Sequence, residues 1–75
     1  MAWLLYTRRG CHLCEEAEDL LAVWRVKVEL VDVDSDAAAL AAYGARVPVL
    51  VRDGTVALEG RFDDRAVATL VRDRD

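Results

Sequence analysis

The apolar residues of this chain follow two kinds of spacing, and these spacings predict its secondary structure. The first apolar run covers Ala2 to Tyr6 and ends at the polar segment Thr7-Arg8-Arg9-Gly10. A short continuous apolar run with such a boundary is typical of a strand that is buried on both faces. We therefore expect a strand at residues 2–6, followed by a loop.

The second segment has the spacing of an α-helix. Four acidic residues lie near its start, where the helix dipole favours negative charge. The spacing predicts a helix that begins at or just after Cys11, with one apolar face. The residues of that face are Leu13, Ala17, Leu20, Leu21 and Trp24.

A second strand and a short second helix are expected next. Residues 26–30 alternate between apolar and polar, and residues 31–33 continue the enrichment in valine, which predicts a strand over 26–33. A strand, a helix and a strand in this order imply a right-handed parallel crossover. Asp34 or Ser35 can cap a helix through 37–43, and Gly44 suits its left-handed end.

The last third of the chain predicts a hairpin and a final helix. Two apolar runs, 47–51 and 55–58, flank the pair Asp53-Gly54, which is a strong signal for an antiparallel hairpin. Asp63 can cap a helix with an apolar face. The expected order of elements is βαβαββα, and the residues of that last face are Ala66, Val67, Leu70 and Val71.

Length and charge narrow the possible functions. The chain has 75 residues, which predicts a single domain over residues 1–75 with a small core. Ten basic and fourteen acidic residues give a net charge of -4, which argues against a nucleic acid partner. No apolar run reaches the roughly 20 residues that cross a membrane. Residues 1–7 lack the flanking features of a signal peptide, so we expect a cytoplasmic protein without a membrane partner.

Cys11 and Cys14 are the one group of residues in the sequence whose spacing indicates reactive chemistry. A disulfide between them would close a very small loop and would stabilise the fold little, so the pair does not serve as a structural disulfide. At a strand-to-helix junction, Cys-x-x-Cys is instead typical of a redox motif. Cys11 faces the free N–H groups and the positive end of the helix dipole, which favour a thiolate. We expect Cys14, one turn further, to be more buried and to act as the resolving thiol.

The charged neighbours of Cys11 have opposite effects on the stability of its thiolate. Arg8, Arg9 and a protonated His12 would stabilise its thiolate, whereas the two glutamates that follow Cys14 would oppose it. His12 is therefore a candidate for tuning Cys11. Its alternative interpretation is a solvated residue at the start of a helix.

Other interpretations of the cysteine pair stay open. The two residues could be ordinary buried cysteines, or the chain could be a redox-silent adaptor. They could also be ligands in a carrier of a metal or an iron–sulfur cluster. Structural zinc requires four donors, and His12, adjacent to Cys11, would point elsewhere. Such a carrier would need a second chain or an external thiol, so no metal site is expected within one chain.

The segment Leu5 to Cys14 resembles the active-site segment of glutaredoxins, a group with the thioredoxin-like fold. The most similar members are the short glutaredoxin-like proteins, which resemble this chain over nearly its full length. The shared features are the Leu-Cys end of the motif, Val31-Asp32-Val33-Asp34, Tyr43-Gly44, Arg46-Val47-Pro48-Val49-Leu50, Asp53-Gly54 and Phe62-Asp63.

The resemblance implies a fold, an activity and a substrate loop. The fold is an α/β sheet of four mixed strands with helices on both faces. The activity is dithiol–disulfide exchange, in which Cys11 attacks and Cys14 resolves. In such folds the proline that opens the third strand is usually cis, and the residue before it offers its backbone to the substrate. Pro48 and Val47 occupy these positions.

Departures from the family pattern concern glutathione. Arg8 stands where a lysine is common and could meet a carboxylate of glutathione. In the family, a pair of glycines lets the backbone of glutathione approach. In this chain Glu59 replaces the first of them, and only Gly60 is kept. Glu59, Asp63 and Asp64 add like charge near the last helix, so we expect glutathione to be a poor partner.

The sequence thus predicts a small cytoplasmic thiol–disulfide oxidoreductase. It needs no cofactor, acts as a monomer, and exchanges disulfides with a protein or a small thiol. An external reductant, either glutathione or an enzyme like thioredoxin reductase, would restore the dithiol. The candidate site residues are Cys11, Cys14, His12, Arg8, Val47, Pro48 and Gly60.

Overall fold

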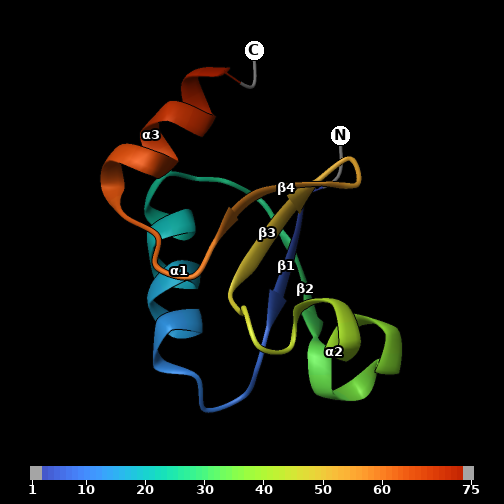
Figure 1. The fold of residues 1–75 in the computed structure, drawn as a ribbon. Coiled ribbons are helices and arrows are strands. Elements are labelled where there is room, and N and C mark those ends of the chain that lie inside the picture. Colours follow the sequence, from blue (N-terminus) through green and yellow to red (C-terminus); the bar gives the residue numbers. More distant parts are fainter. Residues whose placement is uncertain (1–2, 74–75) are drawn as a thin grey trace.

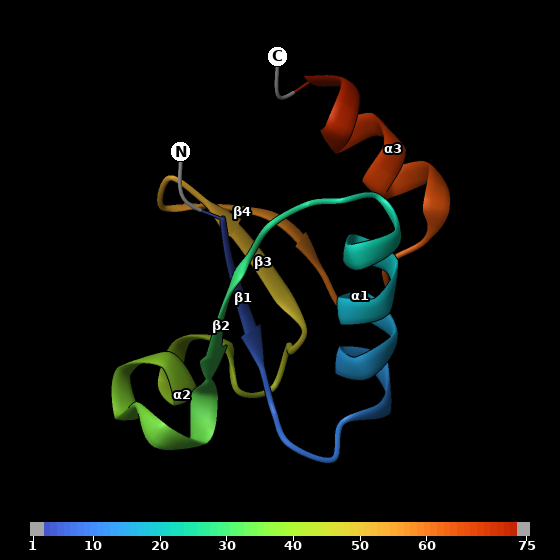
Figure 2. The same cartoon turned by 180° about the vertical axis from the view of Figure 1, so that it is seen from behind.

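The computed structural model describes residues 3–73 (Figures 1 and 2). The expected order βαβαββα is confirmed, with one added 3₁₀ turn, η1. No helix in this part of the chain is long and apolar enough to cross a membrane. The elements are β1 (Trp3–Thr7), α1 (His12–Val23), β2 (Glu29–Asp32), η1 (Val33–Ser35), α2 (Ala37–Tyr43), β3 (Val49–Arg52), β4 (Thr55–Glu59) and α3 (Asp64–Asp73).

The four strands form one mixed sheet in the order β2-β1-β3-β4. β1 pairs in parallel with β2, and Leu5 of β1 lies opposite Leu30. β1 pairs antiparallel with β3, where Leu5 lies opposite Leu50, and β3 pairs antiparallel with β4. The apolar run of β1 is explained by this central place, because both edges of β1 are hydrogen-bonded and both faces are covered.

Neighbouring residues of β1 point to opposite faces of the sheet and contact different helices. Leu5 is fully buried in a cluster with Leu21 of α1 and Val67 of α3. Tyr6 faces the other side, where its ring centroid lies 4.5 Å from that of Tyr43 in α2. Helices therefore cover both faces, with α1 and α3 on one and α2 on the other (Figures 1 and 2). This is the thioredoxin-like α/β fold that the resemblance implied.

The strand boundaries differ from the predicted ones. β1 ends one residue later than expected, at Thr7, while Ala2 lies outside the described residues. The second strand was predicted over 26–33, but β2 covers only Glu29–Asp32. Val26 instead follows the end of α1: Arg25 has φ 59°, and the Val26 N–H donates to Leu21 O at 2.9 Å. Its backbone N–H thus closes the helix end, and its apolar side chain packs in the core rather than marking a strand.

Two expectations for the second helix are wrong. Asp36 caps it, because its Oδ1 accepts from the N–H groups of Ala38 at 3.0 Å and Ala39 at 3.3 Å. Asp34 and Ser35, the predicted caps, belong to η1. Gly44 is not left-handed, since its φ is -54° and its ψ is -36°.

The hairpin and the last helix agree with the sequence, although β3 covers Val49–Arg52 rather than 47–51 and β4 ends at Glu59 rather than at 58. Asp53 and Gly54 have φ values of 50° and 83°, the two left-handed residues that a tight hairpin turn requires. Asp63 caps α3, because its Oδ1 accepts from the Ala66 N–H at 2.8 Å. Sequence patterns therefore located both elements through their turn and cap residues.

We predict that Gly44→Ala destabilises the protein. A Cβ at this position would lie 2.6 Å from Leu40 O and 2.7 Å from Leu40 Cδ1. Relief of such a clash costs about 1 to 3 kcal/mol, more than the roughly 1 kcal/mol by which alanine favours a right-handed helical backbone. Urea unfolding measures the change. A more stable variant would show that the space beside Leu40 accepts a methyl group.

Candidate active site

Cys11 is the N-cap of α1. Its backbone is extended, with φ -90° and ψ 114°, and its Sγ accepts a hydrogen bond from the Cys14 N–H at 3.2 Å. The Cys11 N–H donates to Arg8 O at 3.2 Å, which closes the loop after β1. The sulfur therefore takes the place that a serine or aspartate oxygen usually fills at a helix start. A free N–H aimed at sulfur stabilises a negative charge on that atom.

Cys14 lies one turn further along α1 and has an exposed fraction of 0%. Burial raises the pKa of its thiol above the ordinary value, and the hydrogen bond with Cys11 raises it further. Cys11 is only partly buried, and both thiols are free. The two sulfurs thus have unlike surroundings: Cys11 is open to reagents and Cys14 is shielded.

The ends of all four strands meet at the edge of the sheet that carries the Cys11 loop. Thr7 of β1 lies opposite Asp32 of β2, and the pairing of Tyr6 with Val49 brings Pro48 beside Thr7. Gly60 follows β4, and its N–H donates to Pro48 O at 2.9 Å. The register therefore assembles this edge from the start of β3 and the ends of the other three strands (Figure 1).

The loop before β3 has the backbone that the resemblance implied for Val47 and Pro48. The Val47–Pro48 bond is cis, as the resemblance implied, and Pro48 is fully buried while Val47 is partly exposed. Gly60 has φ 77° and open space where a Cβ would stand. Pro48 and Gly60 are thus brought together, but no hydrogen bond between them and either cysteine occurs within residues 3–73.

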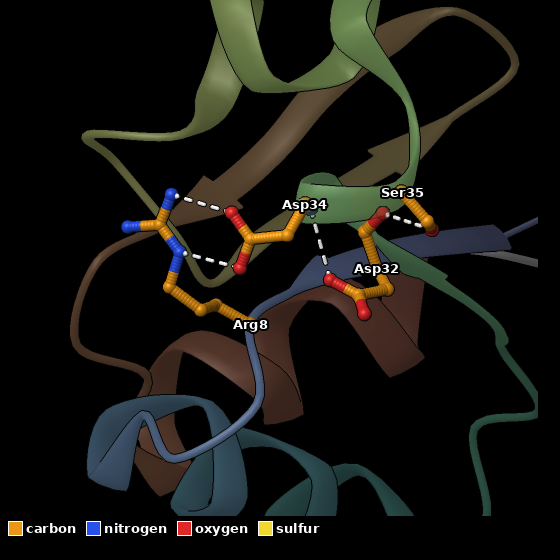
Figure 3. A network of polar contacts seen from close by, with 4 residues as sticks. All are labelled: Arg8, Asp32, Asp34 and Ser35. Atoms are coloured by element: carbon orange, nitrogen blue, oxygen red, sulfur yellow. Dashed lines mark hydrogen bonds and ion pairs between the residues drawn. The ribbon is translucent and has the colours of Figure 1, made fainter.

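Arg8 does not present a free guanidinium to the site. Its Nε donates to Asp34 Oδ2 and its Nη2 to Asp34 Oδ1, each at 3.1 Å (Figure 3). This hydrogen bonding and the charge of Asp34 raise the pKa of Arg8. Asp34 is itself held in η1, since its N–H donates to Asp32 Oδ1 at 2.9 Å and the Ser35 hydroxyl donates to Asp32 O at 2.9 Å. Arg8, expected to meet a substrate carboxylate, meets a carboxylate of its own chain.

Asp34 was missed as a site residue, although a signal for it existed. The parallel crossover implied that the second strand ends beside the end of the first. Arg8 directly follows β1, and Asp34 comes two residues after β2. Opposite charges at the neighbouring ends of two parallel strands are candidates for an ion pair.

His12 is directed along the helix. Its side chain is 87% exposed, and its Nε2 lies 3.3 Å from Glu16 Oε2, one turn further. A charged imidazole would therefore be matched first by Glu16. The tuning of Cys11 by His12 stays a prediction.

A second ion pair lies at the same end of the sheet, where β3 begins and β4 ends. Arg46 Nη1 lies 2.9 Å from Glu59 Oε2, and Arg46 Nη2 donates to Ala42 O at 2.9 Å. The guanidinium also lies over the Tyr43 ring, 5.3 Å from its centroid. Glu59 was expected to add unbalanced negative charge near the last helix, but Arg46 offsets that charge.

A hollow of about 350 Å³ opens beside the Cys11 loop. It lies between the first half of α1 and β2, where Leu30 is 52% exposed. Within the described residues, no group of three or more His, Cys, Asp or Glu side chains could hold a metal ion. The residues that line the hollow are Thr7, Arg8, Arg9, Gly10, Glu15, Glu18, Leu30 and Asp32.

The sequence matches the family model of the glutaredoxin-like domain (DUF836) over residues 3–72. The chain belongs to the glutaredoxin-like family. The match covers β1, the cysteine loop and nearly all of α3, so the family includes every element of the site. No curated protein sequence is significantly similar to the chain.

Solved structures of two proteins have the same fold. The X-ray structure of protein XcR50 from X. campestris is 37% identical, with a TM-score of 0.83 over 99% of this chain and 100% of that chain. The solution structure of protein Ne2328 from Nitrosomonas europaea is 28% identical, with a TM-score of 0.76 over 92% of this chain and 88% of that one. This glutaredoxin-like chain therefore has close to the full length of both proteins.

We predict that the two thiols differ in their rates of alkylation. In a Cys11→Ser variant, Cys14 should react more slowly at neutral pH than Cys11 does in Cys14→Ser, because only the thiolate reacts, and the burial that raises the pKa of Cys14 lowers its thiolate population and hinders access of the reagent. Burial, the larger cause of the raised pKa of Cys14, persists in that variant. The Cys14 rate should keep rising into the alkaline range. Equal rates at neutral pH would reverse the assignment of the two thiols.

Proposed function

We propose that this glutaredoxin-like protein is a dithiol oxidoreductase in which Cys11 attacks disulfides and Cys14 resolves the mixed disulfide. The observation that carries the proposal is the geometry of α1: a partly exposed sulfur at the N-cap accepts the N–H of a buried cysteine at 3.2 Å. Such a sulfur lies where reagents can reach it, with a helix N–H group directed toward it. The second thiol is protected until a mixed disulfide forms.

The exchange needs two displacements and no cofactor. The Cys11 thiolate attacks one sulfur of a substrate disulfide, so that the Cys11–substrate S–S bond forms, the substrate's own S–S bond breaks and one thiolate leaves. Cys14 then loses its proton and attacks Cys11 Sγ, which releases the second substrate thiolate. The substrate gains two electrons and, after protonation, two thiols. The protein is left with a Cys11–Cys14 disulfide.

In this proposal a substrate docks at the end of the sheet that carries the Cys11 loop. The backbone of Val47 is the surface against which a substrate segment would lie, and Gly60 leaves open space beside Pro48. The substrate is a disulfide of a protein or a small thiol compound, and an external reductant restores the dithiol. A monomer in the cytoplasm, where thiols are kept reduced, suits this cycle.

We predict that Cys14→Ser traps the mixed disulfide. With a neutral small disulfide, the Cys14→Ser protein should accumulate an adduct on Cys11, because no second thiol can displace it. The unchanged protein should instead reach the intramolecular disulfide and release two thiols. Mass spectrometry of acid-quenched samples separates these products. Cys11→Ser is the matched control, and an adduct formed as fast on that variant would refute the role of Cys11.

We also predict slow reduction of the oxidised protein by glutathione. The Nε and Nη2 edge of Arg8 is occupied by Asp34, so one glutathione carboxylate lacks its expected cationic partner. The rate with glutathione should be compared with the rate with thioredoxin reductase and NADPH. Tight, saturable glutathione binding that is lost in Arg8→Ala would contradict this expectation and indicate an ordinary glutaredoxin.

A further inference from the structure

The ion pair between Arg8 and Asp34 lies beside the loop that carries Cys11. Arg8 is joined to the reactive loop, because its carbonyl oxygen accepts the Cys11 N–H at 3.2 Å. Its guanidinium and the Asp34 carboxylate lie edge to edge in two hydrogen bonds of 3.1 Å each (Figure 3). A carboxylate in this geometry neutralises the cation and fills the edge that would bind another carboxylate in the same way.

Asp34 is well placed to keep this position. Its backbone N–H donates to Asp32 Oδ1, which holds η1 at the end of β2. Both partners of the ion pair remain partly exposed, with side-chain exposed fractions of 38% for Arg8 and 50% for Asp34. The pair is therefore accessible to an approaching substrate, and its charges are not sealed in the core.

The charged residues that line the hollow beside the Cys11 loop also disfavour an anion. With Arg8 paired, the remaining charged residues that line it are Arg9, Glu15, Glu18 and Asp32. Three carboxylates thus face one cation. An anionic group that approaches Cys11 from this side meets net negative charge, and a cationic group meets attraction.

We propose that Asp34 is a specificity-determining residue that acts through Arg8: by holding the guanidinium, it selects against anionic disulfides and favours neutral or cationic ones at Cys11. This inference rests on the proposed exchange activity and names the substrate class of that site. The substrate would carry neutral or basic groups next to its disulfide. Asp34 does not take part in either displacement step.

A series of small disulfides that differ in charge tests this proposal. The probes are cystamine, bis(hydroxyethyl) disulfide and dithiodipropionate, which are cationic, neutral and anionic at neutral pH. The measured quantity is the second-order rate constant at which each probe oxidises the reduced protein. Asp34→Asn should raise the rate with dithiodipropionate about fivefold relative to the neutral probe, the factor that one unit charge a few ångströms away makes in water. The rate with cystamine should fall.

Asp53→Asn is the matched control. It makes the same chemical change in the turn between β3 and β4, at the end of the sheet opposite to Thr7, because Arg52 pairs with Trp3. Asparagine also tolerates the left-handed backbone of this turn, where φ is 50°. The ratio of anionic to neutral rates should stay unchanged in this variant. Asp34→Ala, which leaves no amide oxygen for Arg8, should reproduce the gain of Asp34→Asn.

A double-mutant cycle separates action through Arg8 from simple loss of a negative charge. In an Arg8→Gln background, Asp34→Asn should give below about half of its gain with dithiodipropionate, since no cation is released. The gain should also shrink from about 0.01 M to about 1 M salt, where the Debye length falls from about 30 Å to about 3 Å. A loss of structural support alone would change all three probes alike.

The outcomes distinguish a failure of the role of Asp34 from a failure of the proposed exchange activity. Equal gains in the presence and absence of Arg8, a gain in Asp53→Asn, or no gain in Asp34→Asn would overturn the role of Asp34 while leaving exchange intact. If the neutral probe does not oxidise the unchanged protein at Cys11 and Cys14, the proposed function itself fails. A selective gain with the anionic probe that depends on Arg8 supports both.

Discussion

The start of α1 is the constraint from which the site follows. The first N–H groups of a helix have no partner within it, and a buried or half-buried helix end must find acceptors for them. Here the acceptor is the Cys11 sulfur, 3.2 Å from the Cys14 nitrogen. The same contact that begins the helix thus directs an N–H group toward the Cys11 sulfur. Because the next turn of α1 packs into the core, it also buries Cys14, so one local geometry makes the two thiols unlike.

The central strand determines what surrounds that helix start. β1 is paired on both edges, so its register with β2 and β3 fixes which residues emerge beside the Cys11 loop. On one side these are Asp32 and then Asp34, and on the other Pro48, which is hydrogen-bonded to Gly60. The register therefore brings residues from distant parts of the sequence to one edge of the sheet, where side chains such as those of Arg8 and Asp34 meet. The strand register is the cause of this arrangement.

Much of this could be predicted because it depends on local signals. The apolar run of β1, the Asp53-Gly54 turn and the Asp63 cap are each determined by neighbours within a few residues. The errors have tertiary causes. Val26 was assigned to a strand because a loop residue packed in the core has the same apolar pattern. Gly44 is required by the nearness of Leu40 O rather than by a left-handed backbone.

The charges of the site show why residue type alone was insufficient. Arg8 and Glu59 were interpreted as a free cation and a free anion, but each is paired, with Asp34 and Arg46 respectively. Pairing leaves the total charge unchanged but alters which charges remain without a partner at the surface. An arginine three residues before a reactive cysteine attracts an anion only if no carboxylate of the same chain reaches it first. In this protein the parallel pairing of β1 with β2 brings such a carboxylate within 3.1 Å of two guanidinium nitrogens. The electrostatics of the site are thus a property of the sheet as much as of the loop.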